Sequence, residues 1–464
     1  MKRALALALT ALMSGCAMVG PDYQRPATDL PAAYPESRQA LDASLTVPAE
    51  WWQLYKDPLL SELVAGGLKN NSDLRIATAR IEEAEAVLRE ANALFYPEID
   101  GNAGASRARS STRTGTLPAS VAAIRNNFVL TASTSFELDF WGRLRRAAEA
   151  ARAQYFATNY GRDVVALTLA AGIAHTYFSA RSLDAQIIVS QETLKAAQES
   201  LEIARGRFEA GLVAELDVNQ AAASRAQLAA QVTALRRLRA AAVHQLGVLT
   251  GVLDLKLDPG DLRALPRPPL PPAGLPSTLL DRRPDVRRSE AELAAANAQI
   301  GVAKAAQLPT FSLTAALGRQ SRELDTLFAA GGGLWSLGLN LAGPIFDAGR
   351  YAARTQQAEA RARQAAASYE STARNAFREV ADALSNLRYA SEMENDLAEQ
   401  VEQASNALRL ARIRYESGYS AYLEVLDAQR TLNQARLELV RNRHIYLDYT
   451  VDLMNALGGG WAPY

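Results

Sequence analysis

Two stretches of the chain repeat one pattern at an offset of about 207 residues. RFEAGLVAELDV begins at Arg207, and RYESGYSAYLEV begins at Arg414. In each stretch an apolar periodic segment stops at a glycine, Gly211 or Gly418, and a second periodic segment begins a few residues later. This pattern is typical of two helices joined by a tight turn. The offset therefore predicts an internal two-fold repeat, whose unit is a helical hairpin together with the segment that precedes it.

The segments on either side of each glycine predict long helices. Residues 143–205 lead to the first turn, residues 350–415 lead to the second, and the return helix of the second hairpin covers residues 422–457. Apolar and small side chains recur there in alternating steps of three and four, which is the seam of a coiled coil. The seam positions are Ile187, Ser190, Leu194, Ala197, Leu201, Ala204 and Phe208, then Val218, Ala221, Arg225, Leu228, Val232 and Leu235, and in the second hairpin Leu397, Val401, Ala404, Leu408, Ala411 and Tyr415, then Val425, Ala428, Leu432, Ala435 and Leu439.

Four segments with a period of two precede these helices, two in each half. Residues 127–140 alternate apolar and polar side chains, residues 96–108 do so more weakly, and residues 310–318 and 334–345 repeat the arrangement. Each is near the length of a strand that crosses an outer membrane. An open sheet cannot lie in lipid, because its edges leave backbone groups unpaired, and closed membrane barrels need about eight strands or more. The strands must then be pooled between chains: three chains give about twelve strands around a polar lumen, and two give a narrow, filled barrel.

The N-terminus has the features of a bacterial lipoprotein signal. Lys2 and Arg3 precede the apolar residues 4–13, small residues follow, and the single cysteine, Cys16, comes next. We expect acylation at Cys16, sorting to the outer membrane and no disulfide within the chain. Residues 17–60 are rich in proline and aromatic residues and predict an extended arm.

Composition and motifs exclude several functions. The formal net charge is +0, which argues against nucleic-acid binding. No run of about 18 apolar residues follows the N-terminus, so no membrane-spanning helix is expected. His175, His244 and His444 are far apart in the sequence, and no hydrolase, metalloprotease or phosphate-loop motif is present. We expect neither catalysis nor any cofactor besides the lipid at Cys16.

Five segments in order resemble a known family. CAMVGPDYQRP, ELDFWGRLRRAAEAA, DRRPDVRRSEAELAAANAQIGVAKAAQLPTFSL, RYESGYSAYLEVLDAQR and ALGGGW are similar to the outer-membrane factors of tripartite efflux pumps, in the acylated OprM-like or NodT-like branch of TolC-type channels. The resemblance implies a mostly α-helical chain with a β-barrel part. It also implies a homotrimer that shares a 12-stranded barrel and a periplasmic helical tunnel. The implied partners are a periplasmic adaptor and an inner-membrane transporter, often of the proton-driven resistance-nodulation-division class.

The two repeats differ at three positions that point to a gate. Tyr415, Asp427 and Arg430 stand where the first repeat has Phe208, Gln220 and Ala223. In the resembling family, matching Tyr, Asp and Arg positions form a periplasmic constriction. We expect the Tyr415 hydroxyl to reach Asp427 and Arg430 across the hairpin or from a neighbouring chain; an ordinary exposed ion pair is the alternative.

Two further sets of residues are candidate sites. The hairpin tips, Gly211 with Leu212 and Gly418 with Tyr419, are candidate contacts for the adaptor. Glu137 and Asp139 lie on the polar side of the 127–140 segment and are candidate acidic residues of the lumen; generic wetting of the wall is the alternative.

These features predict the following organisation: signal peptide 1–15, acylated arm 16–60, first efflux repeat 61–250, proline-rich connector 251–280, second repeat 281–457 and tail 458–464. The expected function is an outer-membrane exit channel for drugs or other small molecules, with its helices in the periplasm and its periplasmic end gated. A structural coiled-coil lipoprotein without channel activity is the alternative.

Overall fold

The computed structural model describes residues 18–34, 47–111, 113, 122–271 and 276–461. The chain divides into two compact units. Unit 1 comprises Met1–Ala27, Arg80–Thr158 and Ser289–Tyr369, and unit 2 comprises Thr28–Ala79, Asn159–Arg288 and Glu370–Tyr464. The predicted Cys16 lies outside the described residues.

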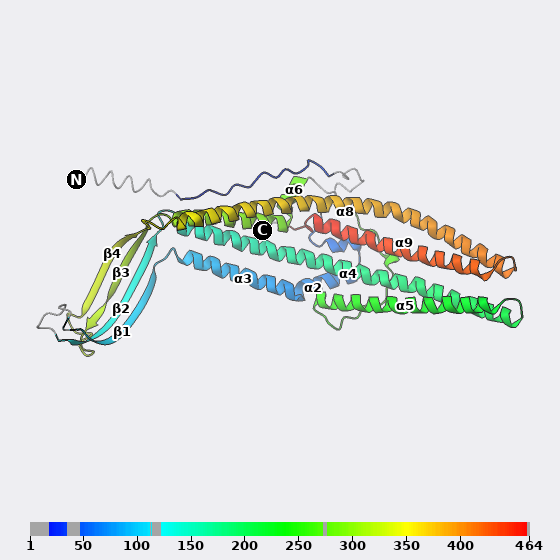
Figure 1. Cartoon of the computed structure of the whole chain (residues 1–464), viewed down its shortest axis with the longest axis horizontal. Helices are drawn as coiled ribbons and strands as arrows, with labels where there is room; N and C mark the ends of the chain where they lie inside the picture. Colours follow the sequence, from blue (N-terminus) through cyan, green and yellow to red (C-terminus); the bar gives the residue numbers. More distant parts are fainter. Residues whose placement is uncertain (1–17, 35–46, 112, 114–121, 272–275, 462–464) are drawn as a thin grey trace. The chain divides into compact units, whose positions relative to one another are not determined.

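Unit 1 contains one antiparallel sheet of four strands (Figure 1). The strands are β1 (Glu98–Arg109), β2 (Ile124–Leu138), β3 (Thr310–Ser321) and β4 (Gly333–Ala342), in the order β1-β2-β3-β4. Among the described residues, β1 and β4 each pair with a single strand, so the sheet has two open edges. The prediction of four strands is confirmed, with ends shifted by a few residues.

The register places most of the large apolar side chains of the four strands on one face, with Val129 and Leu334 on the other. Leu130 lies opposite Ala103 and Arg319, and Phe136 lies opposite Leu313. Leu313 in turn lies opposite Leu339. Because side chains alternate between the two sides of a strand, these pairs define an apolar face and a polar face. The apolar face carries Ile99, Gly101, Ala103, Ala105, Arg107 and Arg109 of β1, the even-numbered residues of β2, and the odd-numbered residues of β3 and β4.

The helices follow the same order and nearly the same lengths in both halves of the chain. In the first half, α3 (Ser72–Ala93) precedes the strands, and α4 (Arg143–Glu209) and α5 (Glu215–Thr250) follow them. In the second half, α7 (Pro284–Ala305) precedes the strands, and α8 (Arg350–Glu416) and α9 (Tyr422–Ala456) follow them. The ends of α4, α8 and α9 agree with the predicted helices to within a few residues.

The seams of the two hairpins are largely buried in unit 2. Ala197, Leu201 and Ala204 of α4 are buried, as are Ala404, Leu408 and Ala411 of α8. A cluster that includes Leu201, Ala221, Leu408 and Val425 brings all four hairpin helices together. The small seam residues permit close packing of helices. Two positions of the predicted seam are exposed: Phe208, with 44% of its surface exposed, and Arg225.

The extended arm predicted for residues 17–60 is wrong at its C-terminal end. Trp51–Tyr55 form a 3-10 helix, and Trp51 and Tyr55 are fully buried in the main core of unit 2. The next helix, α2 (Pro58–Asn70), begins with Asp57 as its N-cap, whose carboxylate accepts the N–H groups of Leu59 and Leu60. The aromatic residues Trp51, Trp52 and Tyr55 of the predicted arm are therefore core residues. The connector also contains two short helices, Leu262–Ala264 and α6 (Pro276–Arg282).

Among the described residues, one helix is long enough and apolar enough to cross a membrane. An 18-residue segment of α4 is apolar enough to cross a membrane, whereas no such helix is expected from the sequence. Half of that segment is buried within the protein. The helix supplies Ile173, Ala174, Tyr177 and Phe178 to the main core of unit 2. We therefore assign its apolar residues to the core.

Candidate functional site

The apolar face of the sheet is exposed along its length. Trp335, Leu337 and Leu339 of β4 are 78%, 69% and 68% exposed, and Leu317 of β3 is 69% exposed. A continuous apolar surface of this kind marks contact with lipid or with another protein. In unit 2, by contrast, the apolar side chains of the core are buried. The sheet is thus built to be covered by something outside the single chain.

The two acidic residues predicted for the lumen have partners. Glu137 lies on the polar face and accepts two hydrogen bonds from Arg143, at 2.9 and 2.6 Å. This pairing raises the pKa of Arg143. Asp139 follows the end of β2; it accepts the backbone N–H groups of Leu144 and Arg145, both at 3.0 Å, and so caps the first turn of α4. The side chains of Arg143 and Arg145 thus offset the charges of Glu137 and Asp139 at this end of the sheet.

The two hairpin tips have the same backbone structure. At the first, the Leu212 N–H donates to the Arg207 carbonyl and the Gly211 N–H donates to the Phe208 carbonyl. At the second, Tyr419 and Gly418 donate in the same way to Arg414 and Tyr415. This is the Schellman motif, which needs a left-handed residue, and Gly211 and Gly418 have φ values of 71° and 80°.

Apolar side chains extend from both tips into solvent. Leu212 is 68% exposed and Tyr419 is 80% exposed. Leu216 and Leu423, one turn further along, are 63% and 58% exposed. Each tip therefore presents two large apolar side chains on a fixed turn, which is suited to contact with a protein partner.

Tyr415 lies in the core between the two hairpins. It is 7% exposed, its ring lies 5.3 Å from that of Tyr422, and the Arg207 guanidinium lies 4.7 Å from its centroid. Arg207 also donates to the Tyr415 carbonyl at 3.0 Å. Burial raises the pKa of Tyr415 against the opposing effect of the adjacent Arg207. The hydroxyl makes no hydrogen bond of good geometry with the described residues.

Asp427 and Arg430 are exposed on α9. Within the described chain neither side chain makes a hydrogen bond or ion pair, and neither meets Tyr415. The contact across the hairpin, which was one of the two expected routes, is therefore not formed in a single chain. The second route, contact with a neighbouring chain, is still a prediction.

Two histidines that are distant in the sequence are brought together in unit 2. The ring of His175 in α4 contacts Asp448 at 2.9 Å and Asp452 at 3.1 Å. His444 Nε2 lies 3.1 Å from the other oxygen of Asp448, outside hydrogen-bond geometry. Sequence analysis missed this group, although His444, Asp448 and Asp452 are spaced by four residues along one helix face. No group of residues in the described part of the chain has the arrangement of a metal site.

The pKa of His175 is raised and the pKa of His444 is lowered, because burial and hydrogen bonding act differently on the two rings. Burial alone lowers the pKa of His175, but its hydrogen bonds to Asp448 and Asp452 outweigh burial and raise the pKa to about 9. Burial lowers the pKa of His444, and the nearby His175 lowers it further against the effect of Asp448. His175 is therefore charged at neutral pH and His444 is neutral.

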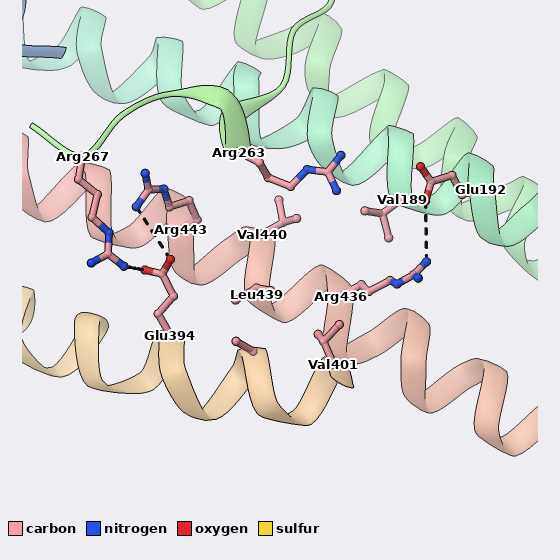
Figure 2. A pocket seen from close by; sticks show the side chains of 11 residues that line it. Val189, Glu192, Arg263, Arg267, Glu394, Val401, Arg436, Leu439, Val440 and Arg443 are labelled. Atoms are coloured by element: carbon pink, nitrogen blue, oxygen red, sulfur yellow. Dashed lines mark hydrogen bonds and ion pairs between the residues drawn. The ribbon is translucent and has the colours of Figure 1, made fainter. Parts of the chain in front are cut away.

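A cavity of about 660 Å³ lies between α4, α8, α9 and the connector in unit 2 (Figure 2). Arginines line it more densely than carboxylates: Arg267 and Arg443 share Glu394, and Arg436 lies 3.8 Å from Glu192. Burial lowers the pKa of Arg443, and the neighbouring Arg267 lowers it further against the effect of Glu394. Glu394 therefore offsets the charge of two neighbouring arginines.

The segment that follows Cys16 is held against unit 1. The Val19 N–H donates to the Trp141 carbonyl at 3.0 Å, three residues after the end of β2. Arg146, with 2% of its side chain exposed, donates to Asp22 at 2.7 Å. Gly20 packs so closely on Gly301 that a Cβ atom would lie 2.5 Å from its Cα. Residues 19–22 are thus fixed beside the end of the sheet from which α4 begins.

Comparisons with known proteins agree with this architecture. The family described as "Outer membrane efflux protein" matches residues 64–252 and again residues 275–459. The solvent efflux pump outer membrane protein SrpC of Pseudomonas putida is 36% identical over 460 residues, which cover 97% of each chain. The probable outer membrane lipoprotein SilC of Salmonella typhimurium is 31% identical, and the match covers 98% of each chain.

Solved structures of outer-membrane channels have the same fold. The structure of the outer-membrane channel OprN superposes with a TM-score of 0.89 at 31% sequence identity, and covers 96% of this chain and 100% of that one. The same family accounts for the exposed apolar face, for the helical hairpins and for both halves of the sequence. The chain belongs to the outer membrane efflux protein family.

Proposed function

We propose that this outer-membrane efflux channel subunit works as a homotrimer, in which three sheets close one barrel of about twelve strands. The observation that carries the proposal is a four-stranded sheet with an exposed apolar face and two open edges. In lipid, open edges leave backbone groups unpaired at a cost of several kcal/mol each. Pairing of β1 with β4 of a neighbouring chain would satisfy both edges.

An acylated Cys16 would anchor the chain in the same membrane. The described segment begins two residues later and is bound beside the end of β2. A lipid on Cys16 would therefore sit near the end of the sheet from which the helices begin. This geometry supports a location of that end at the periplasmic leaflet, with the helices in the periplasm.

The channel would provide passive exit, with energy supplied by an inner-membrane transporter. A periplasmic adaptor would dock at the tips around Gly211 and Gly418, whose exposed leucine and tyrosine side chains support this role. The transporter would be of the resistance-nodulation-division class. Drugs, solvents or other small molecules would be exported, as the name of SrpC suggests for that relative.

Purified protein in planar bilayers tests the proposal directly. We expect a detergent-stable trimer by native mass measurement and discrete single-channel conductance steps. A monomer that still forms pores would contradict the trimer. A trimer without conductance, both in the native protein and in a variant in which the predicted gate residues Tyr415 and Arg430 are replaced, would favour the alternative, a structural coiled-coil lipoprotein, for which a membrane-crossing sheet has no use.

A further inference from the structure

The apolar face of the sheet carries charge at one end only. Along the four described strands its charged residues are Arg107 and Arg109 of β1 and Arg319 of β3. The strand carboxylates Glu98, Asp100 and Glu137 alternate onto the polar face. The three arginines all lie at the end where β1 joins β2 and β3 joins β4, which we call the loop end.

The register places these three arginines around one surface patch. Arg109 lies opposite Ile124, Arg107 lies opposite Asn126, and Arg319 lies opposite Leu130 across β2. Neighbouring strands lie about 4.8 Å apart and each residue adds about 3.4 Å along a strand, so the Cα atoms of Arg107 and Arg319 are separated by roughly 17 Å. Extended arginine side chains can therefore approach one ligand from both sides.

Within the described residues, the guanidinium groups of Arg107 and Arg109 are unpaired and that of Arg319 is partly engaged. Arg107 and Arg109 are exposed, and neither makes a hydrogen bond or ion pair with the part of the chain that the structure describes. Arg319 uses Nη1 to donate to the carbonyls of Phe328 and Ala329, at 2.8 and 3.2 Å. Phe328 itself is 67% exposed beneath the guanidinium, and Leu324 of the same loop is 65% exposed. Cations and apolar side chains thus share one surface, as an amphiphilic ligand requires.

The location of this end follows from the proposed function, on which the inference rests. The helices and the segment after Cys16 lie at the opposite end of the sheet in unit 1. If that end faces the periplasm, the loop end lies at the outer leaflet. A cation that faces lipid is costly at the centre of a bilayer and nearly free of cost at its interface, so these arginines belong at headgroup level. The outer leaflet of a bacterial outer membrane is built from lipopolysaccharide, whose lipid A carries phosphates at that level.

We infer that Arg107, Arg109 and Arg319 form a binding site for the phosphates of lipid A on the lipid-facing surface of the channel. Guanidinium groups bind phosphate oxygens in a two-pronged geometry that lysine lacks. Acyl chains would lie along Trp335 and Leu337 on the same face, both strongly exposed. The site would fix the channel in the outer leaflet and order the lipid around it.

The sheet supplies a matched control. Arg125 and Arg322 lie at the same end, are exposed, and have no hydrogen bond or ion pair within the described residues. Arg125 belongs to the polar face, because it lies opposite Ala108, and both residues line a separate hollow with Asn127 and Gln320. Removal of these two charges changes the net charge as much as removal of Arg107 and Arg109 does.

The test is binding of fluorescent lipid A to the purified full-length trimer in detergent. We expect bisphosphorylated lipid A to bind the native protein at least tenfold more tightly than dephosphorylated lipid A or phosphatidylglycerol. Arg107→Gln with Arg109→Gln should weaken binding at least tenfold, and Arg125→Gln with Arg322→Gln should change it less than twofold. The difference in lipid A affinity between the two double variants should shrink in high salt, because salt screens exposed charges.

Three outcomes would overturn the inference: equal loss in the two double variants, binding that is independent of the phosphates, or binding of inorganic phosphate alone at the same affinity. Conductance of each variant is recorded in the same preparations. A channel that conducts normally but shows no preference for lipid A contradicts only this inference. Absence of conductance both in the native protein and in the gate variant Tyr415→Phe with Arg430→Ser contradicts the proposed function itself.

Discussion

Arg267 and Arg443 share the carboxylate of Glu394 at the edge of the cavity in Figure 2. Loss of this carboxylate leaves two neighbouring guanidinium groups facing each other, one of which is only 13% exposed. We expect Glu394→Gln to destabilise the protein by about 1–3 kcal/mol. The measurement is the apparent melting temperature in detergent.

Glu399→Gln is the control for Glu394→Gln. Glu399 lies on the same helix, is exposed, and has no ion pair among the described residues. Its substitution should change stability by less than about 0.5 kcal/mol. An equal effect of the two substitutions would show that the cavity arginines do not depend on Glu394.

The His175 group gives a pH dependence whose sign can be derived. The pKa of His175 rises from its ordinary value of 6.5 to about 9 in the folded protein. Its contribution to stability is therefore complete below about pH 6.5 and is lost as the pH rises towards 9. The lowered pKa of His444 acts in the opposite sense, because stability is lost as the pH falls below 6.5.

We expect His175→Gln to flatten the decline of melting temperature between pH 6.5 and 9. His444→Gln should instead flatten the decline below pH 6.5. His244→Gln is a suitable control, since His244 belongs to neither pair. A native protein whose melting temperature is constant from pH 6.5 to 9 would contradict the assigned role of His175.

Sequence could predict part of these residue-level features and not the rest. The spacing of His444, Asp448 and Asp452 is visible in the chain, but His175 comes from a helix more than two hundred residues away. Likewise, Tyr415, Asp427 and Arg430 could be selected by comparing the repeats. Their separation in the single chain depends on which helix face each residue occupies.

At the scale of elements, the hairpin turns depend on glycine for a backbone reason. Gly211 has a φ of 71°, and a Cβ added there meets open space, so backbone strain alone opposes substitution. We expect Gly211→Ala to destabilise the hairpin by about 1–2 kcal/mol. Limited proteolysis at the tip and the apparent melting temperature measure the effect.

For Gly206, which lies one turn earlier in the same hairpin, we expect the opposite result. It also has open space around a Cβ, but it lies within α4 and has no positive φ. Gly206→Ala should therefore be neutral or stabilising by up to about 1 kcal/mol. Destabilisation by both substitutions would point to a packing requirement at the tip instead of backbone strain.

Elements were predictable wherever a period was sustained. The long helices carry several heptads each, and the strands alternate over ten or more residues, so their limits agree with the structure within a few positions. The segment from Trp51 to Asn70 was not predicted as helical, because it is short and its aromatic residues gain their role only from the core that surrounds them. The capping role of Asp139 was also hidden, since it depends on where β2 ends.

At the scale of the whole molecule, the anchor can be tested independently of the channel. We expect Cys16→Ser to abolish acylation and to leave the precursor uncleaved by the lipoprotein-specific peptidase. Metabolic labelling with a radioactive fatty acid measures this. Normal labelling of the variant would contradict acylation at Cys16.

The predicted gate also belongs to the assembly. The Tyr415 hydroxyl is buried and makes no hydrogen bond of good geometry with the described residues, while Asp427 and Arg430 are exposed and unpaired within them. In a trimer, three Asp427 carboxylates would approach one another, and contacts from Arg430 of neighbouring chains would offset their repulsion, while the buried Tyr415 holds α8 against α9 within its own chain. We expect Tyr415→Phe with Arg430→Ser to raise single-channel conductance, because contacts that hold the helices together are removed. Asp427→Ala should weaken cation selectivity.

The first repeat supplies the control for the gate. Gln220 occupies the position equivalent to Asp427 and carries no charge, so Gln220→Ala should alter conductance and selectivity much less. The trimer and its binding to the adaptor should persist in all of these variants, which separates opening of a closed end from loss of assembly. Unchanged conductance in the double variant, or an equal effect of Gln220→Ala, would show that Asp427 and Arg430 are ordinary surface residues and that the channel is closed elsewhere.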